Sequence, residues 1–231
     1  MKNQDFGDSN DYLKYVILRS LLAGGSLRLS VNWMRTAAIE GAGSSRSYLD
    51  DNDKWKKLDP ELYVGLQTLL SPDKTPKLAL IESSGLLPRA SFFSKLVPDG
   101  ARDRANWGDE MLGCCSGADL VFLDPDNGIE TPAKIPGSKN SSKYVLWSEL
   151  ERLWLKGASL LIQQHFPRED RDLFATRIST ELKHRTGAAD VLMFKTSQTL
   201  FLLAIQNRHQ AAIRRGLSLQ STRWGSRITA L

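Results

Sequence analysis

Residues 118–130, ADLVFLDPDNGIE, join a short apolar run to a polar turn. Residues 120–123 read Leu-Val-Phe-Leu, which is typical of a strand buried on both faces of a parallel sheet. Asp124 follows at once, and residues 125–128, Pro-Asp-Asn-Gly, are of types that favour a turn. Because a turn does not need a carboxylate directly after four buried apolar residues, the stretch predicts a functional site at a strand end. A turn without a ligand remains the alternative.

Helical and strand patterns alternate on both sides of this stretch. Helical spacing of apolar residues, with Gly, Asp or Pro at several ends, predicts helices over 11–25, 60–70, 143–157 and 168–187. A further helix beginning near Pro88 or Ser91, then RANWGDEMLGCCSG (104–117), leads into the quoted strand. Short runs of strand formers predict strands at 27–34, 77–83 and 158–166, and a pair within 189–207 joined at 195–198.

Strands separated by helices pair in parallel through right-handed crossovers. The sequence therefore predicts an α/β fold with a doubly wound, mostly parallel sheet, helices on both of its faces and an antiparallel hairpin at the C-terminal end. The 231 residues are 41% hydrophobic, which is enough for one large core. We expect residues 1–231 to form a single α/β domain. The polar, glycine-containing residues 35–55 are expected to be a mobile loop.

Composition narrows the class of protein. No apolar stretch is long enough to span a bilayer, and the first residues lack the continuous apolar region of a secretory signal. We therefore expect a cytoplasmic protein without membrane association. The two cysteines, Cys114 and Cys115, are adjacent, so a strain-free disulfide and a metal site are both disfavoured.

Basic residues gather near the end of the sequence. The net charge is +5 and the isoelectric point is about 9.2, a mild excess that favours encounter with a polyanion. The segment 207–228 has no acidic residue. It predicts a contact with RNA or DNA, and the alternative is a solvated helix and tail. The arginines in question are Arg208, Arg214, Arg215, Arg223 and Arg227. The sequence does not indicate an oligomeric state.

Ligands of open parallel sheets bind beyond the carboxyl ends of the strands. The catalytic candidates are accordingly Asp124, Asp126, Asn127 and His165. The alternative for His165 is a structural role, in which its ring forms hydrogen bonds with backbone groups at a strand end.

Candidate cofactor-binding residues come from three places in the sequence. Glu82 ends the strand predicted at 77–83, where a nucleotide-binding fold often places the acid that binds ribose hydroxyls; a surface strand end is as good an explanation. Asp8 and Lys14 form a polar patch over the cofactor edge, or else belong to the charges of a helix N-terminus. Asn32 lies near the end of the strand predicted at 27–34.

Several of these motifs resemble known families. A strand ending in Asp-Pro, a helix, the KGASLLI strand (156–162), another helix and a terminal hairpin are similar to the second half of class I S-adenosylmethionine-dependent methyltransferases. The opening FGDSNDYLKYVILRSLL (6–22) resembles the N-terminal stretch of bacterial ribosomal-RNA adenine methyltransferases, where a Gly-Asn-x-Ala-Asp-x-x-Lys-His run leads into a helix. More closely, GDSNDYLKY, LDPDNGIE, SKYV and QQHFPR together resemble a bacterial family of LDPDNG proteins.

The resemblance implies a Rossmann-like fold, S-adenosylmethionine as cofactor and methyl transfer to nucleic acid or another amine-bearing substrate. Asp124 would then accept a hydrogen bond from the attacking amine, and Asn127 would hold the substrate or close the turn. Two departures stand out. Val31-Asn32-Trp33 replaces the glycine-rich turn after the first strand, with Gly41 and Gly43 too late, and Asn127 replaces the aromatic ring that stacks on the base.

Two other functions remain open. In a Mg²⁺-dependent nuclease or phosphoesterase, Asp124, Asp126, Glu130 and Glu82 would supply oxygen ligands and His165 a base. A non-catalytic nucleic-acid-binding module is the other. EGAGSSR (40–46) contains glycines and hydroxyls that could cradle a phosphate, although it lacks the Lys-Ser ending of a P-loop and is better explained as a flexible loop.

Overall fold

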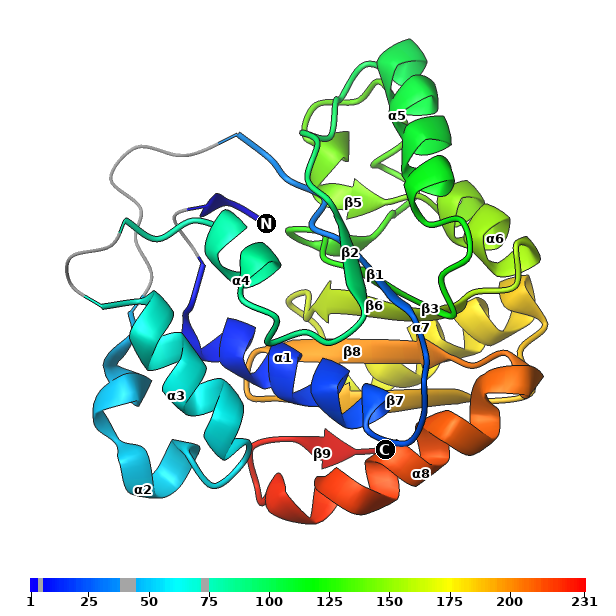
Figure 1. Cartoon of the computed structure of the whole chain (residues 1–231). Coiled ribbons are helices and arrows are strands. Elements are labelled where there is room, and N and C mark those ends of the chain that lie inside the picture. The colour runs from blue at the N-terminus through cyan, green and yellow to red at the C-terminus, as the bar shows by residue number, and fades with distance from the viewer. Residues whose placement is uncertain (4–5, 38–44, 72–74) are drawn as a thin grey trace.

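The strand in the quoted stretch is an inner strand of a seven-stranded sheet (Figure 1). The structure is a computed structural model that describes residues 1–3, 6–37, 45–71 and 75–231. In it, β3 (Leu120–Leu123) pairs in parallel with β1 (Leu29–Asn32) on one side and β6 (Ser159–His165) on the other. The fully buried β3 fits a strand covered on both faces.

The rest of the sheet confirms the predicted fold class. The strand order is β2-β1-β3-β6-β8-β7-β9, where β2 (Ala90–Phe93) pairs in parallel with β1. β7 (Val191–Lys195) and β8 (Thr199–Ala204) form the expected antiparallel hairpin, and β8 lies between β6 and β7, antiparallel to both. The short β9 (Thr229–Ala230) pairs antiparallel with β7 at the sheet edge.

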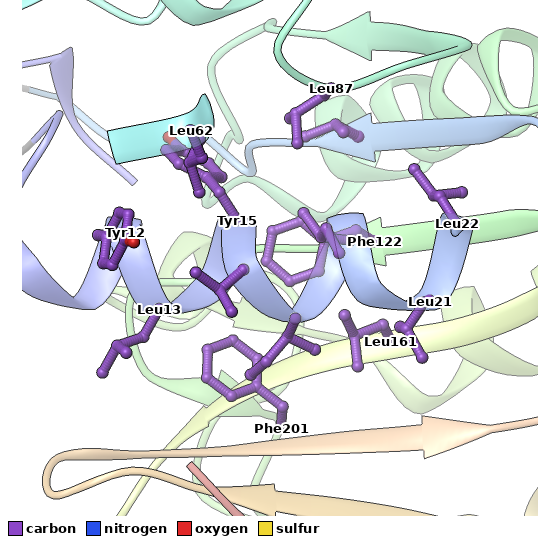
Figure 2. Close-up of a cluster of buried hydrophobic side chains, with 14 of the residues drawn as sticks. Tyr12, Leu13, Tyr15, Leu21, Leu22, Leu62, Leu87, Phe122, Leu161 and Phe201 are labelled. Carbon is purple, nitrogen blue, oxygen red and sulfur yellow. The ribbon is translucent and has the colours of Figure 1, made fainter. Parts of the chain in front are cut away.

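Helices cover both faces of the sheet. This is required because successive apolar side chains of β3 point to opposite faces. On one face of the sheet, Leu120 and Phe122 belong to a core that includes side chains of α1 (Ser9–Leu22), α3 (Pro60–Leu69) and α8 (Gln210–Gln220). On the other face, Val121 and Leu123 belong to a second core with α5 (Ala101–Cys114), α6 (Trp147–Leu155) and α7 (Arg171–Thr186). Figure 2 shows part of the first core, in which side chains of α1 lie beside Phe122, Leu161 and Phe201.

Short elements complete the described chain. They are α2 (Asn52–Trp55), α4 (Ala79–Ser83), the pair β4 (Gly128–Ile129) and β5 (Tyr144–Val145), and the 3-10 turns Ser47–Asp50, Ser141–Lys143, Asn207–His209 and Ser221–Arg223.

Local chemistry explains several helix ends. The carboxylate of Asp59 accepts from the Leu62 amide at 3.0 Å, and Pro60 takes the first helical position of α3. Asp8 caps α1 in the same way, accepting from the Asp11 amide at 2.8 Å. α7 ends at Gly187, whose φ of 68° is a conformation that glycine adopts without steric cost.

Two predicted elements are wrong: one predicted strand is a helix, and one predicted helix is a strand. Residues 77–83 were expected as a strand but contain α4; Leu78, its N-cap, and Ile81, three residues further on, are both buried. The expected helix near Pro88 or Ser91 is instead the edge strand β2. Short apolar runs do not distinguish helix from strand by periodicity, which explains both errors.

The remaining expectations concern the loop at 35–55 and the absence of a membrane-spanning segment. Of the loop expected at 35–55, residues 38–44 lie outside the described residues, and with them Gly41, Gly43 and most of EGAGSSR; the later part contains the 3-10 turn at 47–50 and α2. None of the helices in the described ranges combines the length and the apolarity needed to cross a bilayer.

Candidate functional site

Three parallel strands bring the predicted catalytic residues to one edge. The register aligns Asn32 with Leu123 and Leu123 with Ile162, so the carboxyl ends of β1, β3 and β6 lie together. The Asp124 amide donates to the Asn32 carbonyl at 3.0 Å, and the His165 amide donates to the Asn127 carbonyl at 3.0 Å. The structure therefore unites Asn32, Asp124, Asn127 and His165.

A buried lysine is the immediate partner of Asp124. The Nζ of Lys14, on α1, lies 2.7 Å from Oδ2 of Asp124 and 2.7 Å from Oδ1 of Asp11. Lys14 and Asp124 are each 1% exposed, and Asp11 is 4% exposed. The Lys14 ammonium also lies 5.5 Å from the Tyr15 ring centroid and 5.6 Å from that of Trp33. Two carboxylates thus share one ammonium inside an aromatic enclosure.

Burial shapes the proton affinities of this cluster. It raises the pKa of Asp11 from 3.8 to about 7, against the Lys14 ammonium, while Asp8 and Asp124 raise it further. Burial alone would lower the pKa of Lys14, but the two carboxylates beside it raise that pKa above its ordinary value. The cluster therefore contains a firmly protonated lysine and a carboxyl group that exchanges its proton near neutral pH.

Three buried polar atoms around this cluster have no hydrogen-bond partner among the described residues. They are Oδ1 of Asp124, Nδ2 of Asn32 and the hydroxyl of Tyr15. Buried donors and acceptors are costly when unpaired, so this edge favours a ligand that supplies both a donor and an acceptor. Asn32 is itself held in place, since its Oδ1 accepts from the Met34 amide at 3.1 Å.

Asp126 has different partners from Asp124. Its carboxylate lies 2.5 Å from the amino group of Met1 and 3.2 Å from Lys2 Nζ, and accepts from the Thr36 hydroxyl at 2.7 Å. Burial opposes ionisation, but the Met1 ammonium and these hydrogen bonds lower the pKa of Asp126 to about 2. The two aspartates are thus separately neutralised, and residues 1–2 lie over this edge.

The four carboxylates considered for Mg²⁺ have separate partners. Glu130 accepts from the Trp147 amide at 2.6 Å, and Glu82 accepts from Trp33. Within the described ranges, no three metal-binding side chains are grouped so as to hold an ion. The structure does not bring these residues together as the ligand cluster that a metal-dependent hydrolase requires.

Glu82 lies on a different element from the one predicted, but at the same edge. It belongs to α4, and its Oε1 accepts from Nε1 of Trp33 at 2.8 Å and from the hydroxyl of Ser94. Trp33 follows β1 and Ser94 follows β2, so Glu82 lies beside two strand ends. Asp8, by contrast, is the N-cap of α1, which is the structural alternative for that residue.

The polar turn after Asp124 is fixed by Gln164. The Gln164 side chain accepts from the Ile129 amide at 2.8 Å and donates to the Asn127 carbonyl at 3.1 Å. Gly128 has a φ of 129°, and a Cβ there would lie 2.2 Å from Oε1 of Gln164. Only glycine fits this position, so the Asp-Asn-Gly part of the motif has a structural explanation alongside any functional one.

A groove of about 1010 Å³ opens beside this turn. Asn127 and His165 line it, together with residues of β4, β5 and α7. Burial lowers the pKa of the His165 imidazole below 6.5, against the pull of Asp124 and Asp126, so the ring is neutral at pH 7. Asn127 and His165 can therefore offer uncharged hydrogen-bonding groups to a ligand in the groove.

Sequence reasoning missed some of these contacts. The Thr36 hydroxyl and the Met1 amino group meet Asp126 from more than 80 positions away, and no pattern in the sequence marks them. Asp11 and Lys14 do carry a signal, since an acid and a base three apart inside an apolar helix are positioned to pair.

The C-terminal arginines do not form one free basic surface. Arg208 donates to the Gly157 carbonyl at 2.6 Å, and the Arg227 guanidinium lies 3.8 Å from the Trp55 ring centroid. Arg214 is 3.9 Å from a carboxylate oxygen of Asp190, while Arg215 and Arg223 are exposed. Among the described residues, only two of the five, Arg215 and Arg223, are exposed without a close partner.

Comparisons with known proteins do not assign a family: no family model matches the chain, and no curated protein is similar enough to count as a match.

Proposed function

We propose that this chain is an S-adenosylmethionine-dependent methyltransferase that acts on an amine-bearing substrate at the edge formed by Asn32, Asp124 and His165. The observation that carries the proposal is the Lys14–Asp124 ion pair. Lys14 belongs to the opening motif that resembles ribosomal-RNA adenine methyltransferases, and Asp124 to the strand end that resembles the amino-methylating members of class I. Motifs 110 residues apart meet in one buried contact.

The donors and acceptors at this edge fit the cofactor. Glu82 offers a carboxylate to ribose hydroxyls, and Nδ2 of Asn32 is a buried donor without a partner among the described residues. The bound cofactor would supply an electrophilic methyl group. Oδ1 of Asp124 would accept a hydrogen bond from the substrate amine, while Lys14 holds the other carboxylate oxygen in place.

The proposal predicts that the chain binds the demethylated cofactor, S-adenosylhomocysteine, with a dissociation constant on the order of micromolar in isothermal titration calorimetry. Glu82→Gln should weaken binding about tenfold, because a charge-assisted hydrogen bond to ribose becomes a neutral one. Glu110→Gln is the matched control, since Glu110 lies on α5 and pairs with exposed Lys95. Absence of heat at millimolar cofactor would refute the methyltransferase assignment.

A further inference from the structure

The groove beside Asn127 has apolar walls and a polar inner end. Ile129, Phe166, Phe174 and Ile178 line it, and Phe174 and Ile178 are largely buried against the core. A pocket of this size and character suits an organic ligand with an apolar body.

The arginines at the groove are already neutralised. Arg177 pairs with Glu169 at 2.7 Å, and Arg185 pairs with Glu181 at 2.5 Å and with Glu151 at 2.9 Å. A phosphate entering the groove would have to replace these carboxylates to gain an ionic contact. The groove is therefore poorly suited to a polyanion, in spite of the chain's net charge of +5.

One carboxylate of the groove, that of Glu130, forms no ion pair among the described residues. Glu130 lies on its wall, half-buried, and its Oε1 accepts from the Trp147 amide at 2.6 Å. Burial raises its pKa above 4.5, against the Trp147 hydrogen bond and the charges of Arg185 and Arg104, neither of which is within ion-pair distance, so a cation in direct contact would favour the ionised form further.

Aromatic residues accompany this carboxylate. Trp147 lines the groove next to Glu130, with the Arg185 guanidinium 4.8 Å from its ring centroid on one face, and Tyr144, which pairs with Gly128 across β4 and β5, also lines it. A carboxylate with aromatic rings and apolar walls is a set of groups that binds organic cations through ionic, cation–π and apolar contacts together.

From this geometry we infer that the groove binds the substrate of the proposed methyltransferase, and that this substrate is an organic cation: its ammonium group lies against Glu130 and its apolar or aromatic stem between Ile129 and Ile178, while the amine that accepts the methyl group at Asp124 is a second, unprotonated nitrogen. That the bound cation is a substrate rests on the proposed function. That the groove binds a cation rests on the groove alone. It narrows the substrate from amine-bearing molecules in general to those without phosphate.

Isothermal titration with phenethylammonium chloride, 2-phenylethanol and adenosine monophosphate tests the inference. The ammonium compound should bind with a dissociation constant in the millimolar range, and the other two at least about tenfold more weakly, because they lack the cation. Glu130→Gln should weaken the ammonium compound about tenfold as well. The glutamine Oε1 can still accept from the Trp147 amide, so the fold should be retained, and circular dichroism checks this. Glu110→Gln again serves as the control.

The outcomes are distinct from those of the cofactor experiment. Equal binding of the alcohol, preference for the nucleotide, no binding of the ammonium compound, or indifference to Glu130→Gln would each overturn the inference. If the amine binds and S-adenosylhomocysteine does not, the cation site stands and the methyltransferase assignment fails. If only S-adenosylhomocysteine binds, the assignment stands and the substrate is not an organic cation.

Discussion

Asp11 is a carboxyl group whose ionisation is strongly affected by its surroundings. It lies among Lys14, Asp8 and Asp124, and accepts from the Gly7 amide at 2.8 Å. Its pKa of about 7 means that the folded protein retains a proton that the unfolded chain loses near pH 3.8. A carboxyl group of this kind stabilises the fold most at low pH, and that stabilisation is lost as pH rises from about 4 to about 7.

Asp11→Asn should therefore remove a decrease in stability between pH 4.5 and pH 7.5. The slope contributed by one such group is at most about 1.4 kcal/mol per pH unit. Urea unfolding at several pH values measures it, as the difference between parent and variant. That difference cancels the opposite trend from His165, whose lowered pKa makes acid destabilising below pH 6.5, and Asp126 titrates below this window. Parallel curves for the two proteins would contradict the assignment of a raised pKa to Asp11.

At this scale, the sequence identified the right atoms but not all their neighbours. Asp124, Asn127 and His165 were predictable as one edge, because parallel strands end together. Asp124 and Asp126 are two apart in the sequence, but the structure gives each its own cation, which the sequence did not predict. Contacts of this kind depend on which segment crosses the edge, and neither spacing nor composition specifies that.

Among the packed elements, the close crossing of α1 and α8 depends on two glycines. A Cβ on Gly216, in α8, would lie 2.3 Å from the Ser20 carbonyl, and one on Gly24 would lie 2.0 Å from the Ala212 carbonyl. Backbone on both sides leaves no flexible side chain to move aside. The crossing therefore requires glycine at both positions.

Gly216→Ala should destabilise the protein by about 2 kcal/mol, because the two helices must separate to admit a methyl group. Gly113→Ala is the matched control. Gly113 also lies within a helix, α5, and a Cβ there meets no atom within 4 Å, so its gain in helix propensity of up to about 1 kcal/mol is unopposed. Chemical denaturation of both variants gives the comparison, and equal effects would show that the close crossing is not a constraint on the fold.

Elements with strong patterns were predictable, and those decided by position in the sheet were not. α3 has both an N-cap aspartate and a first-turn proline, and it lies where expected. α4 and β2 were exchanged because five- and four-residue segments carry too little periodicity, and because β2 is an edge strand of mixed exposure. Whether each segment forms a helix or a strand is set by the elements that pack against it.

For the whole molecule, the predicted layers and the mixed sheet are confirmed, whereas the distribution of charge needs revision. The sequence places five arginines together near the C-terminal end, but the fold holds Arg208 against the backbone of Gly157 and Arg227 against Trp55. The charge available to a polyanion is smaller than the count suggests. Arg214 and Arg215, adjacent and exposed on α8, remain the best candidates for a phosphate contact.

The last prediction follows from that redistribution. If α8 contacts nucleic acid, anisotropy titrations of a labelled single-stranded RNA should weaken steeply with KCl, because each phosphate contact releases counterions. Arg214→Glu with Arg215→Glu should reduce the slope of log affinity against log salt by about 1.4, because each arginine that no longer binds a phosphate removes about 0.7. Arg102→Glu with Lys183→Glu, exposed on α5 and α7, gives the same net charge and should leave the slope nearly unchanged. Equal reductions in both double variants would assign the interaction to net charge, and no change in either would assign the α8 arginines to solvent.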